Sequence, residues 1–265
     1  MNSSKTIKFG AKFREAMGFV TETGSLGKIT GVIVVLLLLC KIFYYMEVGK
    51  LIQTLMNYTP ERLIQALMSV DGMSNIINSA DSLRLAITQV VNVHLGFGLI
   101  GVYAVLYLYL KRHPGSKLPK ASPGYYLYMV FSILMTTIIF LVGYYLSMGV
   151  FPLLMLLIWP LMVYTFCSRA EFGGSSMLAM NRAHQDMREY VWKSIGYTAL
   201  LMLIIYGFAI ALSTLLVALL PAQGVKSMTI IYLLADVLFT LVHTRMFVAI
   251  YAENVEKPIV PEEEE

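Results

Sequence analysis

The sequence has little charge and almost no cysteine. Of its 265 residues, 14% are charged and 58% are hydrophobic, whereas a soluble domain carries roughly 25% charged and 45–50% apolar residues. The mean hydropathy of +0.70 reflects long apolar runs, for which a lipid bilayer is the natural solvent. These values argue against soluble enzymes, nucleic-acid-binding proteins and disulfide-rich secreted domains.

The residues that usually carry chemistry are also sparse. The two cysteines, Cys40 and Cys167, fall near opposite faces of the predicted membrane domain and cannot form a disulfide. The four histidines lie on different segments without HExxH spacing, so we expect no metal site. No Ser, Cys or Asp lies in a recognisable nucleophile motif. We therefore expect no catalytic residue and no cofactor.

Six apolar segments are long enough to cross a membrane. A helix rises about 1.5 Å per residue and the hydrocarbon core is about 30 Å thick, so a span needs about 20 residues. The segments are Ile29–Met46, Ile87–Leu110, Tyr125–Ser147, Phe151–Phe166, Ser194–Leu220 and Thr229–Tyr251. The sequence thus predicts an all-α, polytopic bundle of six transmembrane helices over residues 29–251.

Lys and Arg are distributed unequally between the two sides of these spans. One side carries Lys5, Lys8, Lys12, Arg14, Lys28, Lys111, Arg112, Lys117, Lys120, Arg169, Arg182, Arg188, Lys193 and Lys257. The other side carries Lys50, Arg62, Arg84 and Lys226. The positive-inside rule then places both termini in the cytoplasm, as in a plasma membrane protein of the bacterial inner membrane type.

Segments between and beside the spans are predicted to lie at the membrane surface. The cytoplasmic segment 1–28 contains a basic amphipathic stretch suited to an anionic leaflet. The outer loop 47–86 contains a helix start at Thr59-Pro60-Glu61. The cytoplasmic segment 167–193 has an amphipathic pattern typical of interfacial helices. The tail 252–265 ends in a run of glutamates and is expected to be solvated.

Small residues within the spans predict close helix packing. Gly96 to Gly101 match the letters of the dinucleotide fingerprint G-x-G-x-x-G, but they lie inside a span and not after a strand. We interpret Gly98 and Gly101 as a packing face. The same interpretation applies to two small-xxx-small pairs of the fifth span, Gly207 with Ala211 and Ala209 with Ser213.

The sixth span carries a stripe of polar residues. Asp236, Thr240 and His243 share one helix face, and Tyr232 extends that face outward. Such residues are expected to face the bundle or a water-filled cavity, because charge in lipid is costly. The stripe is either a proton, ion or substrate site, or a set of hydrogen bonds that fix packing. Arg245 lies on the opposite face, where it is expected to snorkel toward the cytoplasm.

Lys41 is the candidate partner of Asp236. Lys41 lies five residues before the outer end of the first span, and Asp236 lies seven residues after the outer start of the sixth. At about 1.5 Å per residue the two depths nearly match, so an ion pair would offset much of the desolvation of each charge. Snorkelling of Lys41 is the competing explanation.

Two amphipathic stretches resemble a known membrane domain. The run Ile7-Lys8-Phe9-Gly10-Ala11-Lys12-Phe13-Arg14-Glu15-Ala16 leads into the first span, and residues 177–190 lead through Val191-Trp192-Lys193 into the fifth. Together they are similar to the helical membrane domain found with some bacterial glycerophosphodiester phosphodiesterases and to its stand-alone relatives. The resemblance implies a six-helix bundle without hydrolase activity of its own, because that family's metal-dependent catalytic barrel is a separate soluble domain.

Several functions are compatible with these features. The first is a non-enzymatic membrane protein that handles lipid or a small solute, or that serves as an accessory subunit of a membrane complex. The second is the permease subunit of an ABC-type exporter, with segment 111–124 or 174–192 docking the ATPase. The third is an intramembrane enzyme or proton-coupled carrier that uses Asp236 and His243. The expected partners are the lipid bilayer and other membrane subunits or an ATPase, not nucleic acid.

Overall fold

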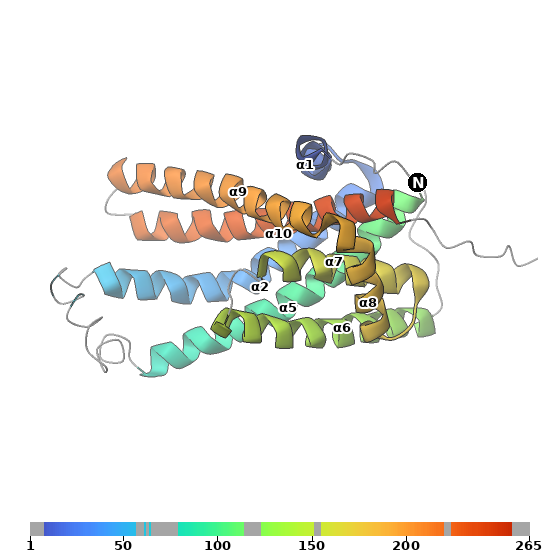
Figure 1. Cartoon of the computed structure of the whole chain (residues 1–265). Coiled ribbons are helices and arrows are strands. Elements are labelled where there is room, and N and C mark those ends of the chain that lie inside the picture. The colour runs from blue at the N-terminus through green and yellow to red at the C-terminus, as the bar shows by residue number, and fades with distance from the viewer. Residues whose placement is uncertain are drawn as a thin grey trace, which may run out of the picture. The chain divides into compact units, whose positions relative to one another are not determined.

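Helices make up every regular element of the described part of the chain. The computed structural model describes residues 8–56, 61, 64, 79–113, 123–150, 155–219 and 224–255. The α-helices can be followed in Figure 1, and short 3-10 helices, η1 and η3, lie between them. In chain order they are α1 (Phe9–Met17), η1 (Gly18–Val20), α2 (Gly24–Met56), α5 (Ser79–Arg112), α6 (Pro123–Val150), α7 (Met155–Phe172), α8 (Ser176–Met187), η3 (Arg188–Tyr190), α9 (Val191–Leu219) and α10 (Gly224–Asn254).

Four described helices are long and apolar enough to cross a membrane. The four stretches are Gly24–Thr54 of α2, Leu83–Arg112 of α5, Val191–Leu219 of α9 and Lys226–Asn254 of α10. They overlap the first, second, fifth and sixth predicted spans. The helix α6 contains a shorter apolar stretch, Val130–Val142, and α7 carries Arg169 in its last turn. The chain therefore fits a multi-pass membrane protein, and the number six stays a prediction.

The helices run past the predicted span boundaries. The helix α2 continues to Met56 and α5 begins at Ser79, so both helices extend into the predicted outer loop 47–86. Polar residues extend α2: Lys50 pairs with Glu47 at 2.5 Å within one turn. Hydropathy marks where a chain leaves hydrocarbon, whereas helical hydrogen bonding can continue into water. For the same reason α2 starts at Gly24, inside the predicted segment 1–28.

Several predicted features fall outside the described residues. They are most of the outer helix predicted to start at Pro60, the greater part of the possible docking segment 111–124, the first residues of the fourth span, and the acidic tail from residue 256 onward. The second possible docking segment, 174–192, is described. It contains α8, whose Ala179, Ala183 and Met187 form a buried face.

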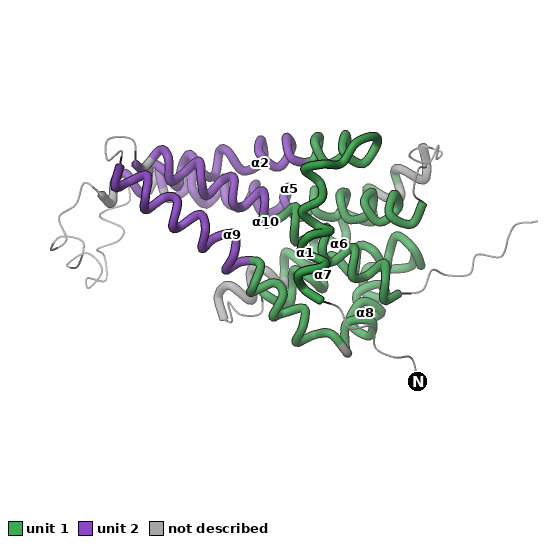
Figure 2. Tube along the Cα trace, turned by 90° about the horizontal axis from the view of Figure 1, so that it is seen from above, with its two compact units in different colours: residues 1–33, 97–201, 239–265 green, residues 34–96, 202–238 purple. Residues whose placement is uncertain are grey.

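The chain divides into two compact units, which Figure 2 colours differently. Unit 1 contains Met1–Ile33, Phe97–Leu201 and Phe239–Glu265, and unit 2 contains Val34–Gly96 and Met202–Leu238. The long helices α2, α5, α9 and α10 each contribute one part to unit 1 and another to unit 2. Each unit contains buried charged side chains of its own.

The turn between α7 and α8 positions several polar residues of unit 1. Gly173 and Gly174 have φ angles of 64° and 88°, a backbone conformation that glycine adopts without steric cost. Ser175 caps α8, because its hydroxyl accepts a hydrogen bond from the Leu178 amide at 3.2 Å. The helix α7 packs against both α6 and α8. The start of α8 is therefore held beside α6 and α7.

The glycine positions do not all serve the packing that their spacing predicted. An added Cβ at Gly101 would lie 2.7 Å from the ring of Phe166 and 3.0 Å from Ile133, so here the backbone is closely approached. At Gly98 and Gly207 an added Cβ would meet no described atom within 4 Å. The packing prediction is therefore wrong within the described chain at these two positions.

The helix α9 shows why the prediction failed at Gly207. In unit 2, Ala209 and Ser213 are buried, at 2% and 3% exposure, whereas Ala211 is exposed. Residues two apart on a helix differ by about 200° in direction, so only one of the two small-xxx-small pairs can face the bundle. Spacing alone could not choose between them.

We expect Gly101→Ala to lower the melting temperature in detergent and Gly207→Ala to leave it unchanged or raise it. At Gly101 the new methyl group meets Phe166, which is only 2% exposed and has little room to move; overpacking of this kind costs about 1–3 kcal/mol. At Gly207 the added methyl group meets no described atom within 4 Å, so the gain in helix propensity, up to about 1 kcal/mol, is not offset by a clash. Equal melting temperatures for the two variants would contradict this packing assignment.

A reporter at Gly149 separates six spans from four. The two topologies differ only in whether α6 and α7 cross the membrane. Since two crossings return the chain to the side where it started, the connections before α6 and after α7 lie on the same side in both topologies. Reporters after Gly115 and Ser175 should thus read cytoplasmic, and one at Gly224 should read external, under both topologies. A reporter at Gly149 should read external if there are six spans. A cytoplasmic reading there would favour four.

Candidate functional site

A largely buried ion pair joins α2 and α10 within unit 2. Lys41 Nζ lies 2.8 Å from Asp236 Oδ2, and the two side chains are 8% and 17% exposed. The structure thus brings together the two residues whose matching depths suggested a pair. Each belongs to a helix that is otherwise mostly apolar, so the pairing offsets part of the cost of removing two charges from water.

Two tyrosines complete the surroundings of this carboxylate. Tyr45 on α2 donates its hydroxyl to Asp236 Oδ2 at 3.3 Å, and Tyr206 on α9 donates to Oδ1 at 3.3 Å. Asp236 therefore accepts hydrogen bonds from side chains of two other helices, with both oxygens engaged. Tyr45 follows Lys41 by four residues and so shares its helix face, and this spacing could have identified Tyr45 from the sequence as a neighbour of the pair. No spacing in the sequence indicates Tyr206.

The remaining members of the polar stripe have different surroundings. His243 is 4% exposed, and its Nε2 lies 3.3 Å from Thr198 Oγ1. Its ring also contacts the rings of Trp159, Phe239 and Phe247 at centroid distances of 4.6–5.9 Å. These contacts favour a packing role for His243. The stripe residues Thr240 and Tyr232 are buried and partly exposed, respectively.

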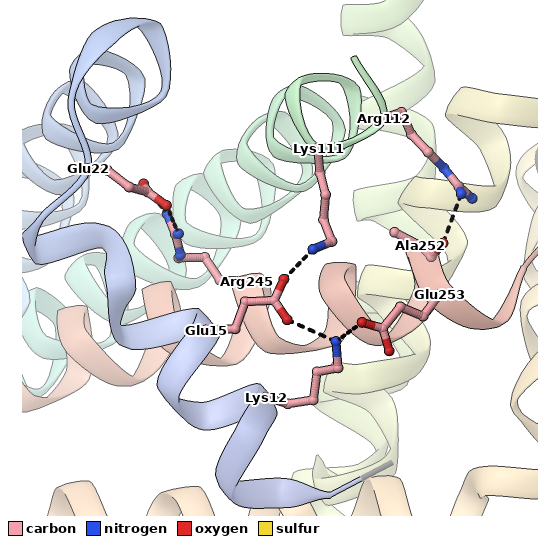
Figure 3. Close-up of polar contacts among 8 residues, drawn as sticks. All are labelled: Lys12, Glu15, Glu22, Lys111, Arg112, Arg245, Ala252 and Glu253. Atoms are coloured by element: carbon pink, nitrogen blue, oxygen red, sulfur yellow. Dashed lines mark hydrogen bonds and ion pairs between the residues drawn. The ribbon is translucent and has the colours of Figure 1, made fainter. Parts of the chain in front are cut away.

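A second group of charges in unit 1 fastens α1 to other helices, as Figure 3 shows. Lys12 donates to Glu15 at 2.8 Å and also to Glu253 of α10, and Glu15 accepts from Lys111 of α5. Lys12 is only 5% exposed. We call Lys12, Glu15, Lys111 and Glu253 the α1 charge cluster. It links the N-terminal helix to α5 and α10.

The ionisation of the α1 charge cluster follows from its pairing. Burial by itself would lower the pKa of Lys12, but the hydrogen bonds to Glu15 and Glu253 outweigh burial and raise that pKa above its ordinary value. Burial would likewise raise the pKa of Glu15, yet Lys111 and Lys12 together lower it. Both residues are thus held in their charged forms.

Arg245 lies in the core of unit 1 and does not snorkel. It is 0% exposed, and its two terminal nitrogens both bind the carboxylate of Glu22, with Nη1 2.8 Å from Oε2. Nη1 also donates to the Tyr103 hydroxyl at 3.0 Å, and the guanidinium lies 4.4 Å from the ring centroid of Tyr107. The snorkelling prediction was wrong, because a bidentate carboxylate and an aromatic face replace water around the cation.

Arg112 at the end of α5 completes the contacts drawn in Figure 3. Its Nε lies 2.8 Å from Glu171 Oε1, and its terminal nitrogens donate to the carbonyls of Ala252 and Val255 at 2.8 and 2.7 Å. A cation at the last carbonyls of α10 satisfies acceptors that the helix leaves open. Arg112 thus fixes the C-terminal end of α10.

The partners of these cations were not assigned from the sequence. Glu15 and Glu22 are the only acidic residues in the sequence of segment 1–28, which is otherwise basic. This was the one feature of the sequence that indicated a role in ion pairing. Their partners Lys111 and Arg245 lie 96 and 223 residues away, so pairing them requires knowledge of the tertiary fold.

The described residues offer no assembled metal site, and comparison with known proteins gives no match. Within the described ranges, no group of three or more His, Cys, Asp or Glu side chains is placed to hold a metal ion. No protein-family model, curated protein or solved structure matches the chain significantly. The resemblance to the membrane domain of glycerophosphodiester phosphodiesterases therefore stays a prediction.

A double-mutant cycle should reveal coupling between Lys41 and Asp236. Lys41→Met or Asp236→Asn alone leaves one charge without its partner, at a cost on the order of 3–5 kcal/mol for a fully buried pair and less here because Asp236 keeps some exposure. We expect the double variant to recover much of that loss in thermal unfolding. If the two single effects simply add, the pair contributes no coupling energy.

The contact between α1 and its partners should weaken at both extremes of pH. The lowered pKa of Glu15 makes its stabilisation complete above the ordinary value of 4.5 and lost as pH falls through the folded-state value. The raised pKa of Lys12 makes its stabilisation complete below 10.5 and lost as pH rises through the folded-state value. Amide protection factors in α1 should therefore be highest between these limits.

Glu15→Gln is the control for the acid limb. This variant should be less protected at neutral pH and should lose part of the acid-dependent change, because glutamine does not titrate. An acid-dependent change of the same size in Glu15→Gln would assign it to another carboxylate.

Proposed function

We propose that this chain is a non-enzymatic, multi-pass membrane protein that binds a small charged solute at Lys41 and Asp236. The observation that supports the proposal is the buried pair itself, held between two mostly apolar helices and joined by the hydroxyls of Tyr45 and Tyr206. Ionisable residues within membrane helices mark substrate or ion pathways by default.

A role restricted to stability explains this arrangement poorly. Replacing a buried ion pair by apolar residues of similar volume is often neutral or even stabilising, because desolvation consumes most of the Coulombic gain. Apolar side chains would therefore hold α2 and α10 together at least as well. If Lys41 and Asp236 separate to bind the charges of a solute, both residues need to be charged.

The donors and acceptors at the site indicate a class of solute. Asp236 supplies two carboxylate oxygens, and Lys41, Tyr45 and Tyr206 supply N–H and O–H groups. A small zwitterion could place its ammonium against Asp236 and its carboxylate against Lys41, which preserves the charge balance when the pair opens. Asp236 retains 17% exposure, so its carboxylate is not fully enclosed in the unliganded protein.

The other functions considered have less structural support. An enzyme using Asp236 and His243 would need the two groups to cooperate, yet Asp236 binds Lys41 and two tyrosines whereas His243 binds Thr198 among aromatic rings. We also infer, as part of this proposal, a plasma membrane location with six spans and both termini in the cytoplasm, supported by the distribution of Lys and Arg.

A thermal-shift experiment tests the proposal with defined probes. The purified full chain in neutral detergent is titrated with glycine, glycine betaine, γ-aminobutyrate and sodium chloride. A bound solute at 100 times its Kd should stabilise the protein by about 2.7 kcal/mol. The Lys41→Met/Asp236→Asn double variant should lose the shift, while Leu203→Ala, at an exposed position of α9, should keep it. A shift that persists in the double variant, or none with any zwitterion, contradicts the proposal.

A further inference from the structure

Arg169 differs from the other buried cations of the described chain. The strongly buried Lys and Arg side chains are Lys12, Lys41, Arg169 and Arg245, with 0–9% exposure. Three of them pair with a carboxylate: Lys12 with Glu15, Lys41 with Asp236 and Arg245 with Glu22. No carboxylate of the described residues forms an ion pair with Arg169, which is 9% exposed.

A hydroxyl group, not a carboxylate, contacts this arginine. Its Nη1 donates to Thr136 Oγ1 of α6 at 3.0 Å, and Ser176 Oγ, on the first residue of α8, lies 3.1 Å from the same oxygen. Thr136 donates its own proton to the Ser132 carbonyl at 2.9 Å, so Ser176 must be the donor in its contact with Thr136. Thr136 Oγ1 thus accepts two hydrogen bonds and has no further capacity.

These contacts leave the charge of Arg169 unbalanced. A hydroxyl oxygen accepts a hydrogen bond but carries no negative charge. The Nε of Arg169 is buried and has no acceptor among the described residues, as is also the case for the Nε of Arg245; unlike Arg245, Arg169 has no carboxylate on its terminal nitrogens either. The undescribed stretches on either side of α6, residues 114–122 and 151–154, contain no Asp or Glu. An isolated buried cation is costly unless an anion accompanies it.

We propose that Arg169 binds a phosphate-class oxyanion through the Nε edge of its guanidinium, at the junction of α6, α7 and the start of α8. The planar guanidinium fork matches phosphate geometry. The N-terminal end of α8, which begins at Ser176, adds a favourable dipole and backbone donors. The anion is either a lipid phosphodiester or free phosphate, since basic pockets between membrane helices accept lipid headgroups. This site lies entirely within unit 1 and is independent of the Lys41–Asp236 proposal.

The test measures thermal unfolding of the full chain, delipidated in neutral detergent, with two phosphate sources. Sodium phosphate is compared with sodium chloride at equal ionic strength, and phosphatidylglycerol with diacylglycerol in mixed micelles. We expect one phosphate source to raise the melting temperature of the wild type by roughly 5–10 °C at about 100 times its Kd. The arm that responds identifies free phosphate or lipid as the source.

Arg169→Gln supplies the decisive comparison, with Arg182→Gln on α8 as the matched control. Without phosphate, Arg169→Gln should be at least as stable as the wild type, because it removes an unbalanced charge. With phosphate, it should show no shift, whereas Arg182→Gln should shift like the wild type. Native mass spectrometry of the wild type, expected to show a phosphate or phospholipid adduct, provides a readout that does not depend on the variants.

Three results would overturn the proposal. The first is destabilisation of Arg169→Gln in the absence of phosphate, since this would show that Arg169 stabilises the fold without an added anion. The second is an equal phosphate-dependent shift in Arg169→Gln and the wild type. The third is the absence of both an adduct and a melting-temperature shift in the wild type.

Discussion

The cost of burying charge governs the polar contacts of this protein. In a chain with so much apolar surface, burying a Lys or Arg costs free energy unless an anion, a carbonyl or an aromatic face replaces water around it. Lys41 uses Asp236, Lys12 uses Glu15 and Glu253, and Arg245 uses Glu22 together with Tyr103 and Tyr107. These contacts fix which helix faces meet, because a mismatched register would leave a charge unpaired.

The same constraint explains why α10 differs from the other apolar helices. The most apolar window of α10 is 83% buried, whereas that of α9 is 22% buried. A helix buried on all sides needs partners for polar residues on every face. Asp236 and Arg245 are nine residues apart, which places them about 180° apart around the helix. Each therefore requires a separate partner, found in Lys41 within unit 2 and in Glu22 within unit 1.

Features that depend on local sequence were predictable, and features that depend on helix rotation were not. Apolar runs located the four long helices, but the predicted first span ends at Met46, whereas the helix α2 continues to Met56. Lys41 and Asp236 could be paired because charges inside spans are few and depth can be counted along each helix. Gly207 and Ala209 could not be told apart, because the sequence does not state which face of α9 turns inward.

Arg245 shows why long-range pairs escape sequence reasoning. A cation near the end of a membrane helix has two ways to avoid lipid, extension toward water or pairing inside the bundle, and the side chain alone is compatible with both. Glu22 decides between them, because the turn before α2, with Gly24 at φ 78°, sets the position of its carboxylate. Once that carboxylate is within reach, pairing supplies two charge-assisted hydrogen bonds. The identity of a buried charge's partner is thus a property of the fold, and a buried cation without such a partner, as at Arg169, points to a ligand.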